Sequence, residues 1–283
     1  MSKLLVFGRS GQVAQELAAL TSKADFLGRE QIDLAQTGEI ANVVERLRPW
    51  AIINAAAYTA VDKAETEQAD ARLLNTEAPA LMARAAAGLN IPFIHISTDY
   101  VFDGSGAEAR SEDDPTGPLG VYGETKLNGE RAVAAEGGNW AVMRTSWVFS
   151  SHGNNFVKTM LRLGRERDEL NIVADQIGGP TPAKDIAATL LMMAEKMAAQ
   201  AKIQGIYHYA GAPSVSWADF AREIFAQADI NCTVHDISTA DYPTPARRPA
   251  NSRLSCLRLQ SDLGIEQPDW RVGLRDVLNN LNR

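Results

Sequence analysis

The sequence has few cysteines, few basic residues and no long apolar run, and each shortage excludes a class of protein. Its 283 residues include two cysteines, Cys232 and Cys256, whose spacing fits neither a disulfide framework nor a zinc site, so we expect reduced packing thiols. A net charge of -7 argues against broad binding to nucleic acid or to an anionic membrane. No segment approaches the ~20 apolar residues of a membrane span, and no secretory leader is evident. We therefore expect a cytoplasmic protein.

The composition is that of a globular enzyme-sized chain. With 45% hydrophobic residues, 283 residues can form one large domain and a smaller one. The histidines are scattered, and we interpret each as structural rather than as a metal ligand. They are His95, His152, His208 and His235.

Short apolar runs alternate with helical patterns through the first half of the chain. The predicted strands are 4–7, 24–27, 51–54, 93–97 and 141–144, and the predicted helices are 39–47, 69–88 and 122–135. Strands separated by helices require right-handed crossovers, which produce a parallel sheet covered on both faces. The pattern therefore predicts an α/β fold, with a Rossmann-type doubly wound parallel sheet.

After residue 147 the alternation weakens and glycine- and proline-bearing loops separate helical patterns. The predicted helices of this half are 155–167, 184–200, 217–228 and 272–281. We expect residues 1–147 to form a dinucleotide-binding domain. Residues 148–283 are expected to form mainly a smaller C-terminal substrate-binding lobe, with possible returns to the sheet.

A glycine turn follows the first predicted strand. Gly8 and Gly11 precede a helical pattern over 15–20, and Ala14 is small enough to keep helix and strand close. Such a turn lets the backbone approach a pyrophosphate, while the helix N-terminus offers free N–H groups. This G-x-x-G-x-x-A pattern is looser than the usual fingerprint, and a plain strand–turn–helix is the alternative. Its position at the start of an α/β chain favours dinucleotide binding.

Tyr122 and Lys126 are four residues apart in a predicted helix, so they share one face. A neighbouring cation favours the phenolate and brings the phenol closer to the working range of a general acid or base. An ordinary surface helix is the alternative. Thr98, at the end of an apolar strand, could hydrogen-bond a carbonyl oxygen beside the phenol. Together these three residues resemble the Ser/Thr-Tyr-Lys set of the short-chain dehydrogenase/reductase superfamily.

Longer segments narrow the resemblance to one family. The chain resembles the dTDP-4-dehydrorhamnose reductases from Lys3 to about Leu278. The segments that carry this are 54–65 (NAAAYTAVDKAE), 97–104 (STDYVFDG), 122–130 (YGETKLNGE), 144–149 (RTSWVF), 154–156 (NNF) and 242–254 (YPTPARRPANSRL). The resemblance implies reduction of the C4 carbonyl of dTDP-4-dehydro-L-rhamnose, the final step of dTDP-rhamnose biosynthesis for cell-surface polysaccharide.

The resemblance also assigns residues. It implies that Tyr122 protonates the carbonyl oxygen, that Lys126 holds the nicotinamide ribose and favours the tyrosinate, and that Thr98 polarises the carbonyl. The implied cofactor contacts are Gly8, Ser10, Gly11, Gln12, Val13, Arg29, Asp33, Leu34, Ala55, Ala56, Ala57, Tyr58, Thr59, Tyr122 and Lys126. The implied substrate contacts are Thr98, Asp99, Tyr100, Trp147, Asn154, Asn155 and Arg253.

The chain departs from its relatives at two places. Related 4,6-dehydratases carry Thr-Asp-Glu at the strand end, whereas this chain has Thr98-Asp99-Tyr100, which favours simple reduction over elimination. Some family members hold magnesium at a dimer contact. Glu16 matches one ligand segment, but Lys184 lies in the other and opposes a hard cation. We therefore expect no metal site, and either a monomer or a homodimer.

Two other functions remain open at this stage. One is a reductase that forms a different dTDP-6-deoxyhexose, because it would keep every motif. The other is a non-catalytic, dinucleotide-binding regulatory subunit, a role that loss of the Tyr-Lys pair would have favoured.

The end of the second predicted strand indicates which dinucleotide is used. An acidic residue there binds the ribose 2′-OH of NAD, whereas arginine attracts the 2′-phosphate of NADP. Here Gly28 occupies the expected acidic position and Arg29 follows it, so we expect NADPH to be preferred over NADH. A solvated Arg29, partly neutralised by Glu30, is the alternative.

Overall fold

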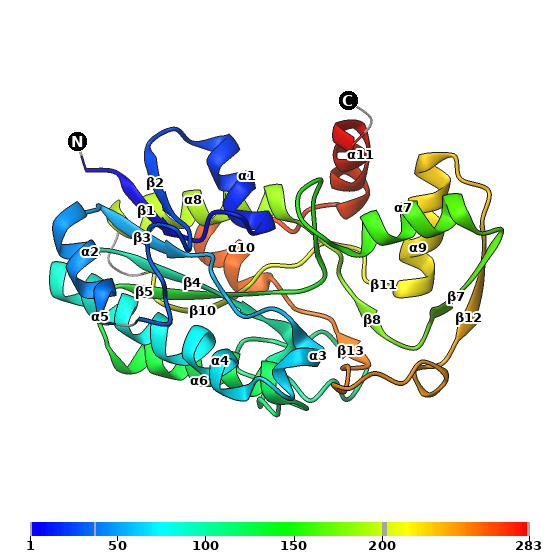
Figure 1. Cartoon of the computed structure of the whole chain (residues 1–283), viewed down its shortest axis with the longest axis horizontal. Coiled ribbons are helices and arrows are strands. Elements are labelled where there is room, and N and C mark those ends of the chain that lie inside the picture. Colours follow the sequence, from blue (N-terminus) through cyan, green and yellow to red (C-terminus); the bar gives the residue numbers. More distant parts are fainter. Residues whose placement is uncertain (1, 37, 200–202, 282–283) are drawn as a thin grey trace.

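A six-stranded parallel sheet organises the fold, shown by a computed structural model that describes residues 2–36, 38–199 and 203–281 (Figure 1). Its strands are β1 (Leu4–Phe7), β2 (Ala24–Leu27), β3 (Ala51–Asn54), β4 (Phe93–Thr98), β5 (Trp140–Thr145) and β10 (Gly205–His208). Across the sheet they run β10-β5-β4-β3-β1-β2, and every neighbouring pair is parallel. The predicted doubly wound sheet is confirmed.

Helices cover both faces of this sheet because its strands are apolar on both sides. In β1, Leu4 and Val6 belong to one hydrophobic cluster and Leu5 and Phe7 to the other, as strand alternation requires. The helices of the first cluster are α1 (Gln12–Leu20), α8 (Ala183–Ala199) and α10 (Leu257–Leu263). Those of the second are α2 (Glu39–Leu47), α5 (Ala78–Leu89) and α6 (Val121–Ala135). Figure 1 shows the two helical layers on opposite sides of the strands.

The helix predicted over 69–88 is interrupted. Here α3 (Val61–Ala64) and α4 (Gln68–Arg72) lead into a π-helical turn, Leu73–Glu77, which continues as α5. The π turn places Asn75, fully buried, so that its side chain accepts from the Tyr58 N–H and donates to the Thr125 hydroxyl. This buried amide therefore links the loop after β3 to α6. The helical period of the sequence does not reveal the π turn that makes the link.

A third hydrophobic cluster forms a smaller lobe. It is built on α7 (Phe156–Glu166), α9 (Trp217–Ala228) and α11 (Trp270–Leu281). Short strands complete it: β6 (Val148–Phe149) with β9 (Thr181–Pro182), β7 (Glu169–Val173) with β12 (Thr233–Ile237), and β8 (Ile177–Gly178) with β11 (Val215–Ser216) and β13 (Asn251–Ser252). Single 3₁₀ turns span Asp99–Val101 and Thr239–Asp241. The end of the helix predicted over 184–200, Gln200, lies outside the described residues.

The second half of the chain contributes to both cores. Helices α8 and α10 and strand β10 come after residue 147, yet they pack on the six-stranded sheet. The chain therefore crosses between the sheet and the smaller lobe more than once. In the described part of the chain, no helix is both long enough and apolar enough to cross a membrane.

Candidate active site

A cavity of about 550 Å³ lies beyond the carboxyl ends of β1, β3, β4 and β5, where ligands bind in open α/β sheets. Its lining comes from the turn before α1, the loop after β3, the end of β4, helix α6 and the segment after β5. The lining residues are Ser10, Gly11, Gln12, Val13, Ala55, Ala56, Ala57, Thr59, Val61, Ile96, Ser97, Thr98, Asp99, Tyr100, Tyr122, Lys126, Thr145, Ser146, Trp147, Val148, Gly153 and Asn154.

The glycine turn leaves room for a pyrophosphate. Gly8 has φ +114, and a Cβ there would lie 3.1 Å from the backbone of Ala55, so the turn and the loop after β3 approach closely only because Gly8 has no side chain. Gly11 is the N-cap of α1 and no side chain caps that helix. The first N–H groups of α1 are therefore open toward the cavity, which fits a bound dinucleotide.

The loop at the end of β2 lies outside the cavity lining. Arg29 and Asp33 are exposed, and the side chain of Leu34 packs against the second hydrophobic cluster. A further cation lies here that the sequence analysis did not single out. The side chain of Arg9 passes over Gly28, and a Cβ on Gly28 would lie 3.2 Å from the Cβ of Arg9. Two arginines thus flank the position where an acidic residue would contact a ribose.

The loop after β3 presents small residues to the cavity. Ala55, Ala56, Ala57 and Thr59 line it. Tyr58 does not, because its backbone is held by Asn75 and its hydroxyl donates to Glu67. The predicted cofactor segment therefore reaches the cavity through four of its five residues.

Thr98, Tyr122 and Lys126 meet in this cavity. Thr98 ends β4, and the other two lie on α6 at positions i and i+4. A Cβ on Gly123 would collide with the carbonyl oxygen of Tyr100, so this glycine lets α6 sit directly against the end of β4. The ring of Tyr122 meets that of Tyr100 edge-on at 5.5 Å. The helix thereby aims its tyrosine at the strand end that carries Thr98.

The acidity of Tyr122 differs from the sequence-based expectation. The i,i+4 pattern predicts a cation that lowers the pKa of the phenol, yet burial raises the pKa of Tyr122 to about 12, with a hydrogen bond to Thr98 acting the other way. The reason is where the lysine points. Lys126 Nζ lies 2.6 Å from the carbonyl oxygen of Ile96 and 3.1 Å from His95 Nε2. Burial lowers the pKa of Lys126 to about 8, against the opposing effect of Glu130.

Asp99 and Tyr100 complete this wall. Asp99 is 3% exposed, and burial raises the pKa of its carboxyl to about 6 although hydrogen bonds to Ser252 and Thr98 oppose the change. Its Oδ2 has no hydrogen-bond partner within the described parts of the chain. A buried acceptor that lines a cavity and lacks a partner is suited to receive a hydroxyl or amide donor from a ligand.

Trp147 faces the cavity in an unusual backbone conformation. Its φ is +49, and its ring stacks on that of Trp217 with centroids 3.4 Å apart. A Cβ on Gly178 would strike the Trp147 ring, so this glycine also shapes the stack. A non-glycine residue at positive φ is strained, and its neighbours must hold it there. Trp217, which the sequence analysis did not single out as functional, is the residue that backs Trp147.

The remaining predicted substrate residues differ in position. Asn154 lines the cavity. Asn155 caps α7 and donates to Gln12 Oε1 at 2.9 Å, so it links the smaller lobe to the glycine turn. Arg253 donates to Asn251 Oδ1 at 3.0 Å, and its backbone carbonyl accepts from Arg110. Neither Asn155 nor Arg253 is among the residues that line the cavity.

A buried ion pair supports α6 from behind. Arg144 on β5 and Glu130 on α6 are each 2% exposed at the side chain, and two guanidinium nitrogens contact the carboxylate at 2.9 and 2.6 Å. Ser97 donates to the same carboxylate at 2.5 Å. Glu130 is one further turn along the face that carries Tyr122 and Lys126. The i,i+4 spacing from Lys126 was the signal that could have identified it.

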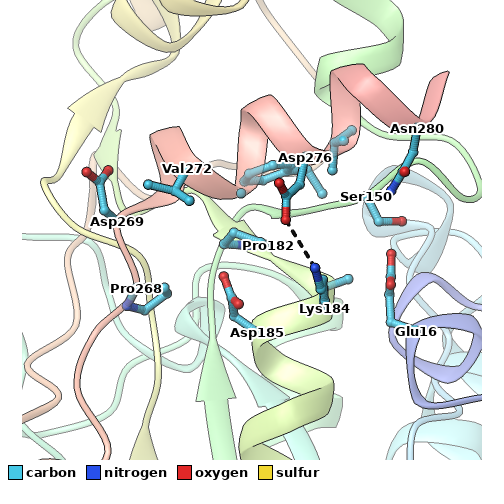
Figure 2. A pocket seen from close by; sticks show the side chains of 14 residues that line it. Glu16, Ser150, Pro182, Lys184, Asp185, Pro268, Asp269, Val272, Asp276 and Asn280 are labelled. Carbon is cyan, nitrogen blue, oxygen red and sulfur yellow. Dashed lines mark hydrogen bonds and ion pairs between the residues drawn. The ribbon is translucent and has the colours of Figure 1, made fainter. Parts of the chain in front are cut away.

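A second cavity, of about 260 Å³, lies between α1, the start of α8 and α11 (Figure 2). Glu16, Asp185 and Asp276 face it, and Lys184 lies among them with its Nζ 3.1 Å from Asp276 Oδ2. Within residues 2–36, 38–199 and 203–281, no group of three or more His, Cys, Asp or Glu residues is arranged to hold a metal ion. Thr98, Tyr122 and Lys126 lie in the larger cavity instead.

Known proteins match this chain over nearly its full length. Residues 2–283 match the family model described as the RmlD substrate binding domain. The dTDP-4-dehydrorhamnose reductase of Sinorhizobium fredii is 47% identical over 286 residues, which cover 98% of this chain and 96% of that protein. A reductase of that name from Clostridium acetobutylicum has a similar crystal structure, with a TM-score of 0.94, 34% identity and coverage of 99% and 100% of the two chains. The Bacillus anthracis reductase, solved in complex with NADP, has a TM-score of 0.92, 32% identity and 99% coverage of each chain.

Proposed function

This chain belongs to the family of the RmlD substrate binding domain, and we propose that it catalyses the reaction of the dTDP-4-dehydrorhamnose reductases, the name that its relatives carry. It reduces the C4 carbonyl of dTDP-4-dehydro-L-rhamnose to the alcohol of dTDP-L-rhamnose, with NAD(P)H as the reductant. The observation that carries the proposal is the meeting of Thr98, Tyr122 and Lys126 in one cavity beside the open N-terminus of α1.

The residues present fit a bound dinucleotide. The turn at Gly8 and Gly11 would hold the pyrophosphate, and the small side chains of Ala55, Ala56 and Ala57 leave space beside it. The bound nicotinamide supplies the hydride that reaches the carbonyl carbon. Lys126 Nζ donates to the carbonyl oxygen of Ile96, and a further N–H of the same nitrogen would contact the nicotinamide ribose.

Side chains of this protein would supply the proton that the reduction requires. Thr98 Oγ1 would hydrogen-bond the carbonyl oxygen, and Tyr122 would donate its phenolic proton to that oxygen as the alcohol forms. A pKa of about 12 keeps Tyr122 protonated at neutral pH, which is the form that a proton donor requires. Asp99 is the one carboxylate among the described residues that line the cavity, and no glutamate stands beside it as the elimination chemistry of dehydratases would need.

The smaller lobe would hold the sugar nucleotide. Trp147 and Asn154 line the cavity from the segment after β5. The proposal includes a division in which residues 148–283 supply mainly the substrate-binding lobe. For the cofactor, Arg9 and Arg29 flank the end of β2 and favour the 2′-phosphate of NADPH over NADH. The proposal also includes a cytoplasmic location and either a monomer or a homodimer.

Product identification tests the function. Purified protein is incubated with NADPH, dTDP-4-dehydro-6-deoxyglucose and a 3,5-epimerase, and the sugar is released from the nucleotide and identified. We expect NADPH oxidation that requires the epimerase, with L-rhamnose as the product. A different 6-deoxyhexose would contradict the substrate assignment, and cofactor binding without oxidation would contradict the catalytic role.

A further inference from the structure

Two side-chain amides join the glycine turn of the sheet to the smaller lobe. Asn155 Nδ2 donates to Gln12 Oε1 at 2.9 Å, and Gln12 Nε2 donates to the backbone carbonyl of Val148 at 3.4 Å. Gln12 is the first residue of α1 and Asn155 is the N-cap of α7, so this amide bridge connects the first turns of two helices. The resemblance implies a substrate contact at Asn155, whereas the structure directs its amide nitrogen to α1.

Backbone groups fix the orientation of both amides. The backbone N–H of Lys158 can only donate, and it donates to Asn155 Oδ1 at 3.1 Å, so Asn155 presents its nitrogen to Gln12. The carbonyl of Val148 can only accept, so Gln12 presents Nε2 to Val148 and Oε1 to Asn155. Both ends of the amide bridge therefore require the same direction, with Asn155 as the donor and Gln12 as the acceptor.

The segment that carries Asn155 also contacts α1 elsewhere. Gly153 has φ +62, and a Cβ there would lie 3.4 Å from Gln12 Cγ, so the backbone of this turn passes close to the Gln12 side chain. His152 Nε2 lies 3.9 Å from Glu16 Oε1, one helical turn further along α1. Residues 148–155 therefore lie against the first two turns of α1 beyond the bridge itself.

The amide bridge stands where two walls of the larger cavity meet. One wall is the glycine turn, whose open N–H groups at the start of α1 suit a pyrophosphate. The other wall is the segment after β5, which carries the residues proposed for the sugar nucleotide. The lining residues of the two walls are Ser10, Gly11, Gln12 and Val13, and Trp147, Val148, Gly153 and Asn154. Gln12 thus lines the cofactor wall and is bonded to the substrate wall.

We propose that Asn155 is a positioning residue that acts through Gln12 to couple the binding of the dinucleotide to that of the sugar nucleotide. The proposal rests on the proposed function for the identity of both ligands. A pyrophosphate held by the first N–H groups of α1 fixes the backbone at Gln12, and the amide bridge then fixes the wall that carries Trp147 and Asn154. Because the first ligand already orders this wall, the second ligand binds more tightly.

The expected size of the coupling follows from the bond that transmits it. One hydrogen bond between neutral groups changes an equilibrium by about two- to tenfold. Saturating NADP⁺ should therefore lower the Kd of dTDP by about two- to tenfold, and saturating dTDP should lower the Kd of NADP⁺ by the same coupling factor. Titration calorimetry measures both, since these two ligands do not react with each other. Independent binding of the two ligands to the parent protein would overturn the proposal.

Asn155→Ser tests the donor of the amide bridge. A serine hydroxyl can still cap α7 but is too short to reach Gln12, so we expect the coupling factor to fall to about one. Thr159→Ala is the matched control. It removes a hydrogen bond to the Asn155 carbonyl in the first turn of α7 and leaves the bridge intact, so it should keep the parental factor. A parental factor in Asn155→Ser would refute the proposal.

Gln12→Met isolates the amide bridge from the turn that Asn155 itself holds. Asn155 Nδ2 also donates to the carbonyls of Ser150 and His152, and Asn155→Ser removes those bonds as well. Gln12→Met keeps them and keeps the backbone N–H, and it should lower the coupling factor to that of Asn155→Ser. Its direct effect on NADP⁺ affinity cancels, because the factor is a ratio of affinities. A parental factor in Gln12→Met would show that Asn155 acts only within its own turn, which contradicts the proposal.

Hydrogen exchange follows the same coupling without a sugar nucleotide. NADP⁺ should slow amide exchange in peptides that cover residues 148–155 of the parent, and much less in Asn155→Ser and Gln12→Met. Peptides from β12 are an internal reference and should be unaffected in all three proteins. Equal slowing over 148–155 in the three proteins would refute transmission through the bridge.

These measurements separate the two proposals. Protein that shows the coupling and loses it in both variants, but forms no L-rhamnose, would contradict the proposed function alone. Protein that forms L-rhamnose but keeps its coupling factor in Asn155→Ser would contradict the role of Asn155 alone. Failure to bind NADP⁺ would overturn both.

Discussion

The charge of Asp99 should destabilise the fold at neutral pH. Burial raises the pKa of this carboxyl from 3.8 to about 6, so the folded protein binds the proton more tightly than the unfolded chain does. The resulting stability is fully present below the unfolded pKa and is lost as the pH rises through about 6. A difference of about two pH units corresponds, at 1.36 kcal/mol per unit, to about 3 kcal/mol. About 1 kcal/mol of this falls between pH 5 and pH 7.

Urea unfolding of the parent and of Asp99→Asn at pH 5, 6 and 7 measures this effect. The free energy of unfolding of the parent should fall by about 1 kcal/mol more than that of the variant between pH 5 and pH 7. Only the slope is compared, because the amide has hydrogen-bonding needs of its own. Asp103→Asn is the matched control. Hydrogen bonds from Ser105 lower the pKa of Asp103, so it stays ionised over this range and its removal should leave the slope unchanged.

If the free energy of unfolding depends on pH equally in the parent and in Asp99→Asn, water reaches the carboxylate and Asp99 is not desolvated in the folded protein. The reasoning about the unpartnered Oδ2 would then fail as well. A steeper fall in the variant than in the parent would mean that the charge of Asp99 stabilises the fold.

Three further outcomes are expected. Tyr122→Phe should keep the fold and cofactor affinity while kcat falls by about 10²–10⁴, because the proton donor is lost; turnover within a few-fold of the parent would exclude that role. Arg29→Ala and Arg9→Ala should each raise the KM for NADPH more than that for NADH, and a parallel rise in both would exclude contact with the 2′-phosphate. Trp217→Leu should raise the KM for the sugar nucleotide with little change in NADPH affinity measured by fluorescence, since it removes the ring that supports Trp147; unchanged kinetics would show that Trp147 holds its conformation alone.

The sheet and the catalytic set were accessible from the sequence because their signals are local. The bounds of β1, β2 and β3 match the predicted strands, since each is a short, mainly apolar segment followed by a turn. Tyr122 and Lys126 share a helix face by spacing alone. Two residues four apart on a helix are neighbours whatever the rest of the chain does.

The rest depends on contacts between distant segments. Asn155 could not be recognised as a helix cap that also holds Gln12, because 143 positions separate the two residues. Strand β10 reads GIYH and carries no period that assigns it to the sheet edge beside β5. The direction of the pKa shift at Tyr122 differs from the one expected from spacing for a similar reason. Spacing placed a lysine beside the tyrosine, but His95 and Ile96, from another strand, decide where its nitrogen points.

The return of α8 and α10 to the sheet has a consequence for synthesis on the ribosome. One face of the sheet is covered by residues up to Ile265, although its first five strands are complete at Thr145. At about 5–20 residues per second, the intervening stretch takes roughly 6–24 seconds to emerge. During that time the nascent sheet displays the apolar side chains of Leu4, Val6 and Ile53 without their final cover. Chaperone demand should therefore concentrate in this interval, and a chain released before residue 265 should aggregate rather than persist as a folded dinucleotide-binding half.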